Sequence, residues 1–268
     1  MPTRRAGHAR RPPSRPPRPG RGAAVEFEVR GGVAWITLAR GGSRNRLEAE
    51  VMAGLVDACD AAEDAAAPVV VLRGEGPAFS AGLPRGCRWP EASWPDGVGA
   101  VGRLAKPVVA ALHGDVLGWG LALALACDVR VAATSAVLAL PELRGGTLPG
   151  GGAVQRLARM IGAARTLEMV LLGIRLTAAR AAEWGLVSAV VGPARLPAAV
   201  EDVARRMAAR GPEALRLAKE AVVKGLDLPL DDGIRLEQDL YVLLQTTEDR
   251  REGVRAFLER RTPRFGGR

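Results

Sequence analysis

The chain has 268 residues, enough for one large domain or for one domain with a helical appendage. Its formal net charge is +9, but residues 1–24 hold seven arginines and no acid, which leaves 31 basic and 29 acidic side chains elsewhere. Because the rest of the chain is therefore almost neutral, composition argues against a nucleic-acid-binding surface on the folded part.

The first segment, residues 1–24, combines the seven arginines with six prolines and almost no apolar side chains. It cannot bury enough apolar surface to offset its chain entropy, so we predict disorder. It also lacks the apolar stretch of a secretory signal. Three interpretations stay open: an extension without function, an electrostatic tether or a targeting segment.

Residues 25–133 alternate between strand-like and helix-like stretches. Gly31-Gly32 separates two strands within residues 25–38, and the helical periodicity from 44 to 67 places Leu47, Val51 and Leu55 on one face. The further elements that we predict are strands at 69–72, 107–112 and 129–133, a helix at 118–127, a loop at 74–82 and an irregular connection at 84–103. The fold class is therefore α/β.

The second half of the chain is predicted to be helical. Gly162, Gly173 and Gly185 end short helices at 153–161, 164–172 and 178–184. Longer helices follow at 197–209, 212–224, 230–245 and 247–257. We divide the chain into a tail at 1–24, a core at 25–210 and a C-terminal helical region at 211–268.

The three cysteines, Cys59, Cys87 and Cys127, are far apart and match no metal-binding spacing. We expect no metal site and a reducing, cytoplasmic location. The apolar run from 104 to 126 is interrupted by Lys106, Pro107 and other polar residues, so we expect no membrane span and no membrane partner.

Several spaced motifs carry the strongest functional signal. They are Phe79-Ser80-Ala81-Gly82-Leu83, the segment from His113 to Asp128 with Gly118-Trp119-Gly120, Pro141-Glu142, and the glycine-rich 145–152 loop before Gln155-Arg156-Leu157. In this order they resemble the enoyl-CoA hydratase/isomerase (crotonase) family over residues 25–265. The resemblance implies a spiral core of repeated ββα units, a C-terminal helical region that forms homotrimers or hexamers, and an acyl-CoA thioester substrate. Coenzyme A then enters as part of the substrate, and no other cofactor is expected.

Family chemistry proceeds through a thioester enolate, whose oxygen needs prearranged hydrogen-bond donors. By motif position these are the backbone N–H groups of Leu83 and Trp119, the latter at a helix start where the dipole favours an anion. Glu142 is the candidate acid/base, and partial burial would raise its pKa toward neutrality.

Ala122 stands where hydratases of the family carry a second glutamate. Since a 1,3-proton shift needs one base, whereas hydration must also hold a water molecule, this favours double-bond isomerisation. Hydration with a replacement carboxylate (Glu91, Asp96 or Asp115), other enolate chemistry and a non-catalytic acyl-CoA-binding role remain alternatives.

Coenzyme A binding leaves a weaker signature in the sequence. The resemblance places Arg44 near the CoA phosphates, Ala81 and Leu83 beside the pantetheine arm, and Gly118 in the substrate site. Phe265 is expected to cover the adenine end from a neighbouring subunit. His113 is interpreted as structural.

Overall fold

The computed structural model describes residues 23–84, 86–87 and 93–267. Its larger sheet has six strands, and every neighbouring pair is parallel except the first, which is an antiparallel hairpin. In spatial order they are β1 (Val25–Arg30), β2 (Val33–Leu38), β3 (Val70–Gly74), β4 (Val108–Leu112), β6 (Val129–Ala133) and β9 (Ala189–Val191). The hairpin turn uses Gly31 and Gly32, both at positive φ, as a two-residue turn requires.

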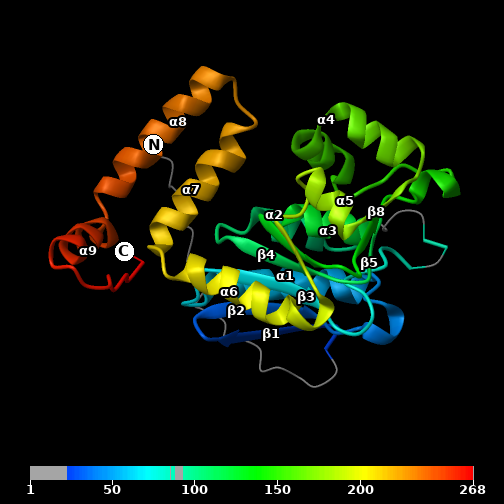
Figure 1. The fold of residues 1–268 in the computed structure, drawn as a ribbon, viewed down its shortest axis with the longest axis horizontal. Coiled ribbons are helices and arrows are strands. Elements are labelled where there is room, and N and C mark those ends of the chain that lie inside the picture. Colours follow the sequence, from blue (N-terminus) through cyan, green and yellow to red (C-terminus); the bar gives the residue numbers. More distant parts are fainter. Residues whose placement is uncertain (1–22, 85, 88–92, 268) are drawn as a thin grey trace, which may run out of the picture.

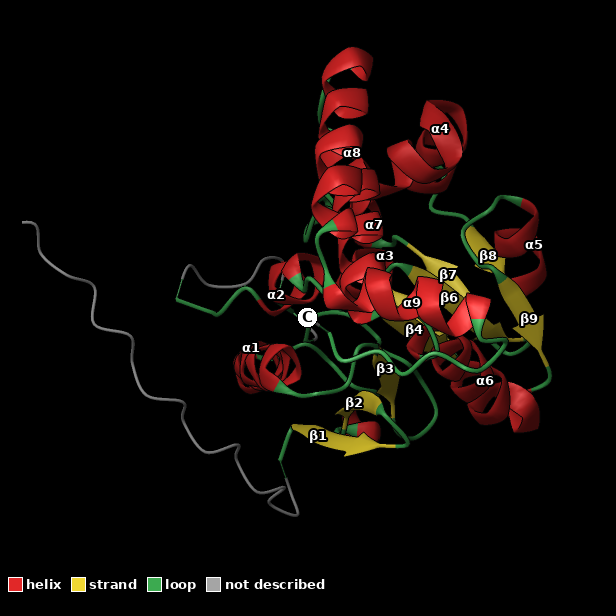
Figure 2. Cartoon of the chain, turned by 90° about the vertical axis from the view of Figure 1, so that its left-hand side faces the viewer, coloured by secondary structure: helices red, strands yellow, loops and turns green. Residues whose placement is uncertain are grey.

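The larger sheet is buried on both faces, which explains why its central strands are almost continuously apolar. Alternate side chains of β2 point to opposite sides: Val33 and Trp35 pack toward α6 (Leu196–Ala208), whereas Ala34 and Ile36 join the main core. The main core is covered by α1 (Ala49–Asp64), α2 (Gly97–Arg103) and α3 (Trp119–Ala126) (Figures 1 and 2).

A smaller sheet contains β5 (Asp115–Leu117), β7 (Val137–Ala139) and β8 (Arg175–Thr177). Ser80 extends it through a parallel bridge to Val116. The chain therefore repeats one structural unit three times. Each unit has a strand in the larger sheet, a short extended segment in the smaller sheet and a helix. The three units are β3, Ser80 and α2; β4, β5 and α3; and β6, β7 and α4 (Ala153–Leu171). This repetition confirms the expected spiral of ββα units.

The remaining helices follow this core. α5 (Ala178–Glu183) precedes β9, and short 3₁₀ helices lie at Gly41–Ser43, Glu142–Gly145 and Pro193–Arg195. α7 (Pro212–Gly225), α8 (Leu230–Gln245) and α9 (Glu248–Leu258) form the C-terminal region, in which α7 and α8 make a hairpin that extends away from the sheets (Figure 1). Lys219 ties α7 to the core, donating to the Asp128 carboxylate at 2.8 Å. Within the described part of the chain, no helix is long and apolar enough to span a bilayer.

Three of the predicted elements need correction. The helix expected from residue 44 begins at Ala49, because Arg44 and Asn45 adopt positive φ in a turn where the buried Asn45 amide donates to Glu75 O and Ala78 O. The connection at 84–103 contains α2, capped by Asp96. The helices expected at 153–161 and 164–172 are joined as α4, with a break in helical geometry at Gly162.

The expected tail lies mostly outside the described residues, which begin at Ala23. Ala24 is already buried, and its carbonyl accepts a hydrogen bond from the Ala39 N–H at 3.0 Å. The folded part of the chain therefore includes at least one residue before β1.

Candidate active site

The smaller sheet brings three distant segments to one edge. Ser80, Val116 and Leu138 are aligned in parallel register, and the chain leaves the sheet in the same direction after each of them. Neighbouring strands lie about 4.8 Å apart. Leu83 and Trp119, each three residues beyond its aligned position, are therefore placed side by side, with Glu142 following the third strand.

Two glycines permit this close approach. Gly82 has a φ of +79°, and a Cβ there would lie 2.7 Å from Leu117 O and 3.4 Å from Trp119 N. Gly118 has a φ of +54°, and a Cβ there would collide with the Glu142 carboxylate. Any larger side chain at either position would separate the segments, so the glycine requirement is steric as well as conformational.

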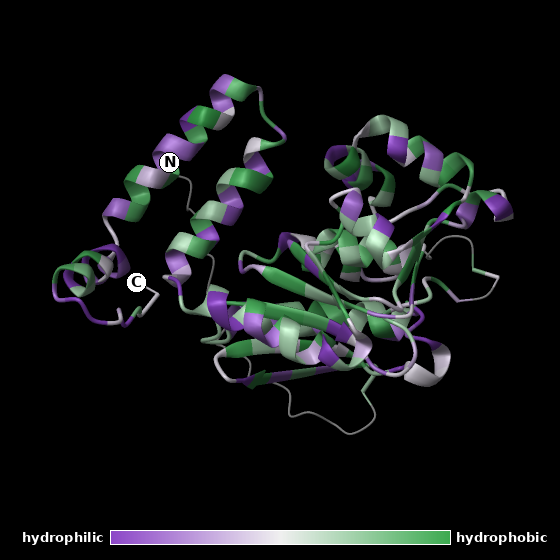
Figure 3. Ribbon diagram, viewed as in Figure 1, coloured by the Kyte–Doolittle hydropathy of each residue, from purple (hydrophilic) through white to green (hydrophobic). Residues whose placement is uncertain are grey.

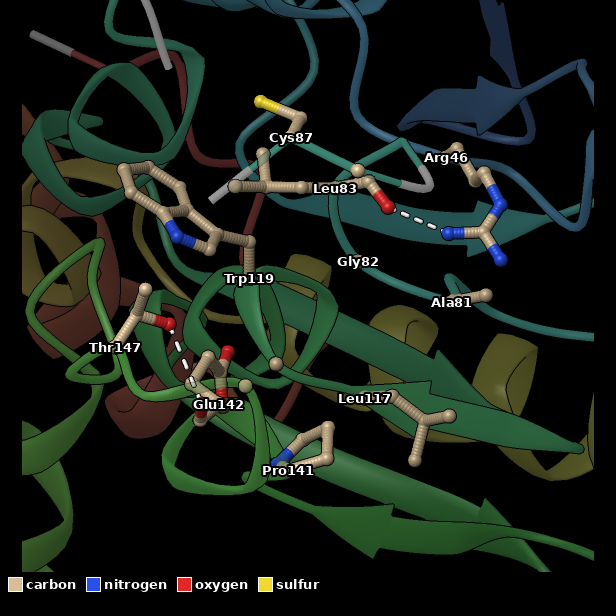
Figure 4. A pocket seen from close by; sticks show the side chains of 13 residues that line it. Arg46, Ala81, Gly82, Leu83, Cys87, Leu117, Trp119, Pro141, Glu142 and Thr147 are labelled. Carbon is tan, nitrogen blue, oxygen red and sulfur yellow. Dashed lines mark hydrogen bonds between the residues drawn. The ribbon is translucent and has the colours of Figure 1, made fainter. Parts of the chain in front are cut away.

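These segments line a cavity of about 370 Å³, shown in Figure 4. The Trp119 indole, Leu83, Cys87 and Thr147 form part of its wall, and the Glu142 carboxylate faces Gly118. Among the described residues, the lining comprises Arg46, Ala81, Gly82, Leu83, Gly86, Cys87, Leu117, Gly118, Trp119, Pro141, Glu142, Gly145 and Thr147.

The backbone supplies the candidate oxyanion donors. Trp119 is the first residue of α3, whose opening N–H groups have no acceptor within the helix. The Leu83 N–H donates no hydrogen bond to any residue that the structure describes. An anionic oxygen placed between these segments would meet N–H groups from both, together with the positive end of the α3 dipole.

Glu142 is held in a 3₁₀ turn directly after Pro141, and the Thr147 hydroxyl donates to its backbone carbonyl at 3.3 Å. Among the described residues its buried carboxylate oxygen Oε2 has no hydrogen-bond partner. Burial raises the pKa of this carboxyl above its ordinary value of 4.5, and a hydrogen bond from its own backbone partly opposes the shift. The raised pKa makes the Glu142 carboxylate a stronger base than a solvent-exposed glutamate, which suits removal of a proton from carbon.

The sequence model of the enoyl-CoA hydratase/isomerase family matches residues 28–268. The chain belongs to this family. It is 37% identical to the 2,3-dehydroadipyl-CoA hydratase of Escherichia coli over 244 residues, which cover 88% of this chain and 96% of that one.

Solved structures of the enoyl-CoA hydratase/isomerase family share the whole fold. The enoyl-CoA hydratase of Bacillus anthracis superposes with a TM-score of 0.85 at 35% identity, covering 91% of this chain and 100% of that one. The enoyl-CoA hydratase of Mycobacterium tuberculosis gives 0.85 at 33% identity, covering 92% and 100%. The crotonase-like fold expected from the motifs is therefore confirmed.

The structure brings most of the predicted site residues together. Leu83, Trp119, Glu142, Ala81 and Gly118 all line the cavity. Whether each of them has its predicted role in this family member stays a prediction.

Arg44 does not reach the cavity. It is exposed, and its guanidinium pairs with Asp115, which also pairs with Arg175 at 3.4 Å. The cavity is lined instead by Arg46, whose Nη1 donates to Leu83 O at 2.5 Å. The sequence did not predict a role for Arg46, because the turn at Arg44 and Asn45 decides which of the two arginines faces the cavity. Such a turn has no apolar periodicity from which it could be predicted.

Phe265, Asp96 and Asp115 also lie outside the cavity lining. The Phe265 ring packs beside Gly211 and Gly253, between the start of α7 and α9. Asp96 accepts from Gly99 N as the α2 cap and pairs with Arg103 at 3.0 Å, and Asp115 holds its two arginines. Glu91 lies outside the described residues.

We predict that Glu142→Gln stabilises the protein at neutral pH. Because the pKa of Glu142 is raised in the folded state, the folded protein holds the carboxyl proton more tightly than the unfolded chain does. The stability that this proton contributes is lost as pH rises from about 4.5 through the raised pKa. Glutamine is neutral throughout. The variant should therefore melt at a higher temperature than the wild type at pH 7, with the difference vanishing below pH 4.5. Thermal unfolding across this range measures it, and an equal or lower melting temperature at pH 7 would contradict the pKa argument.

Proposed function

We propose that the protein isomerises the double bond of a 3-enoyl-CoA to the 2-enoyl-CoA, with Glu142 as its single acid/base. One observation carries this proposal: Glu142 is the only acidic side chain among the described residues that line the cavity. The position of the second hydratase glutamate is occupied by Ala122, which is fully buried and has no ionisable group.

The proposed reaction is a 1,3-proton shift. The Glu142 carboxylate removes a proton from C2, the C3=C4 double bond moves to C2=C3, and the protonated carboxyl returns a proton to C4. Negative charge on the thioester oxygen of the dienolate is stabilised by the N–H groups of Leu83 and Trp119. Atoms balance without water or an oxidant, so we propose that no cofactor is needed besides the CoA of the substrate.

Arg46 is the proposed contact for CoA phosphate, in place of Arg44. It is half-buried at the cavity and is held by Leu83 O, and a guanidinium can still offer further donors to a phosphate. Ala81 and Leu83 on the neighbouring loop are the proposed contacts for the pantetheine arm.

Hydration of a 2-enoyl-CoA is the second candidate, and the hydratase names of the relatives support it. Among the described residues only Glu142 is placed to hold the water molecule, since Asp96 and Asp115 are engaged elsewhere. The test is NMR of the products formed from a 3-enoyl-CoA and, separately, from a 2-enoyl-CoA. We expect the first to become the 2-enoyl-CoA and the second to yield little 3-hydroxyacyl-CoA. Rapid hydration would favour the hydratase, and binding without turnover of either would indicate a non-catalytic homologue.

We propose that the protein assembles into a homotrimer or hexamer through its C-terminal region. Large apolar residues are exposed in the single chain on α8, within the hairpin that extends away from the sheets, and on α9, which follows it (Figure 3). The most exposed are Leu230, Tyr241, Val242, Phe257 and Leu258. An apolar surface of this kind is normally covered by another protein surface. A neighbouring subunit would also be needed for Phe265 to reach the adenine.

Light scattering should therefore give three or six times the mass of one chain. Tyr241→Asp combined with Val242→Asp should lower this mass, because two carboxylates would be buried in the interface. Ser135→Asp, at an exposed polar position in the turn between β6 and β7, should leave it unchanged. A monomeric wild type would contradict the proposal.

We propose that the protein is cytoplasmic. Cys59 and Cys127 are buried thiols, and burial raises the pKa of each to about 12. Neither is bridged, as expected of a protein that folds in a reducing compartment.

A further inference from the structure

We infer that the Trp119 indole separates residue 122 from the cavity and thereby restricts this site to isomerisation, so that a glutamate at 122 cannot act unless Trp119 is also removed. The inference rests on the proposed function. It assigns a specificity role to the side chain of a residue whose backbone N–H is the proposed oxyanion donor.

Trp119 and Ala122 share one face of α3 because they are three residues apart. In a helix the Cα–Cβ bonds tilt toward the N-terminus, so a longer side chain at 122 would extend toward the turn that contains Trp119. The indole therefore lies on the side of α3 toward which a glutamate at 122 would extend.

The glycine-rich loop closes over both side chains. A Cβ at Gly150 would lie 2.5–2.9 Å from Cζ2, Cε2 and Nε1 of the indole. A Cβ at Gly151 would lie 2.9 Å from Ala122 Cβ and 3.2 Å from Cε3 of the same indole. Only a backbone without side chains can pack this closely, so the loop packs directly on both the indole and Ala122.

The exposure of Ala122 and Trp119 agrees with this arrangement. Ala122 is 0% exposed and is absent from the cavity lining, whereas Trp119 lines the cavity among the described residues. Figure 4 shows the indole on the cavity wall with Leu83 and Thr147 also in the lining. The indole offers one N–H donor and no acceptor, so it cannot activate a water molecule as a carboxylate does.

The experiment compares hydration of a 2-enoyl-CoA by Ala122→Glu, Trp119→Gly and the double variant, with Trp119→Gly/Ala122→Gln as the control of equal shape. We expect the double variant to hydrate at least ~10²-fold faster than Ala122→Glu, the lower end of what a positioned acid/base contributes. The glutamine control should show no gain. Should Ala122→Glu not fold, Trp119→Leu/Ala122→Glu takes its place, because leucine still separates residue 122 from the cavity.

Equal hydration by Ala122→Glu and the double variant would overturn the inference, as would a folded double variant without any gain. Isomerisation of a 3-enoyl-CoA by the wild type is measured alongside. If the wild type does not isomerise the 3-enoyl-CoA but the double variant still hydrates faster than both single variants, the proposed function fails. The role of Trp119 as a barrier then stands.

Discussion

Glu142→Gln is expected to lower kcat for isomerisation of a 3-enoyl-CoA by ~10²- to 10⁴-fold, the usual contribution of a positioned acid/base. Glutamine keeps the shape of the side chain but cannot accept the C2 proton, and no other acidic group among the described residues lines the cavity to replace it. Steady-state kinetics of conjugation measures the loss. The affinity for the 2-enoyl-CoA product should change little, because the contacts proposed for CoA do not involve Glu142.

Glu183→Gln is the matched control for this change. Glu183 is an exposed glutamate at the end of α5, where it pairs with Arg180 at 2.8 Å. Its loss should leave kcat within about twofold, because a surface ion pair contributes little. A Glu142→Gln enzyme that keeps more than about a tenth of the wild-type kcat would mean that another group moves the proton.

Gly82→Ala should be almost as damaging, through the oxyanion donors. The added methyl would lie 2.7 Å from Leu117 O, so the Leu83 segment must move away from the segment that carries Trp119. Displacing one such donor typically costs ~10²- to 10³-fold in kcat. Measurement of kcat and KM separates this effect from weaker substrate binding, because the donors act mainly on the enolate.

Gly32→Ala controls for the backbone strain in this experiment. Gly32 has a φ of +73°, close to the +79° of Gly82, but a Cβ there meets nothing within 4 Å and the residue lies in the β1–β2 hairpin. Both variants should lose about 1–2 kcal/mol of stability from the left-handed backbone. Only Gly82→Ala should lose activity, and similar activity losses in the two variants would show that strain, not donor position, was responsible.

The site could be anticipated from the sequence because its motifs are local. Leu83, Trp119 and Glu142 each sit beside glycine or proline, whose backbone preferences mark the turns. The smaller sheet that joins them was not predicted, since β5 and β7 have three residues each and cannot display a period. The parallel bridge at Ser80 is a tertiary contact without a sequence pattern.

Other features depended on contacts between distant segments. Arg44 and Arg46 flank the same asparagine, and the left-handed turn sends one to Asp115 and the other to the cavity. The absence of a glutamate at 122 was visible in the sequence. The position of the Trp119 indole next to residue 122 could not be predicted, because it depends on the packing of Gly150 and Gly151, which are distant in the sequence. Long amphipathic helices such as α6 and α7 were predicted well because their apolar spacing repeats over several turns.

The most direct test of single-base catalysis follows a deuterium label from C2 of a 3-enoyl-CoA in ordinary water. If Glu142 alone carries the proton between C2 and C4, a measurable fraction of the 2-enoyl-CoA product should hold deuterium at C4, because the same carboxyl returns what it removed. Glu142→Gln should form no such product. A wild-type product without deuterium at C4 would mean that a second donor or bulk water protonates this carbon, which would contradict the account.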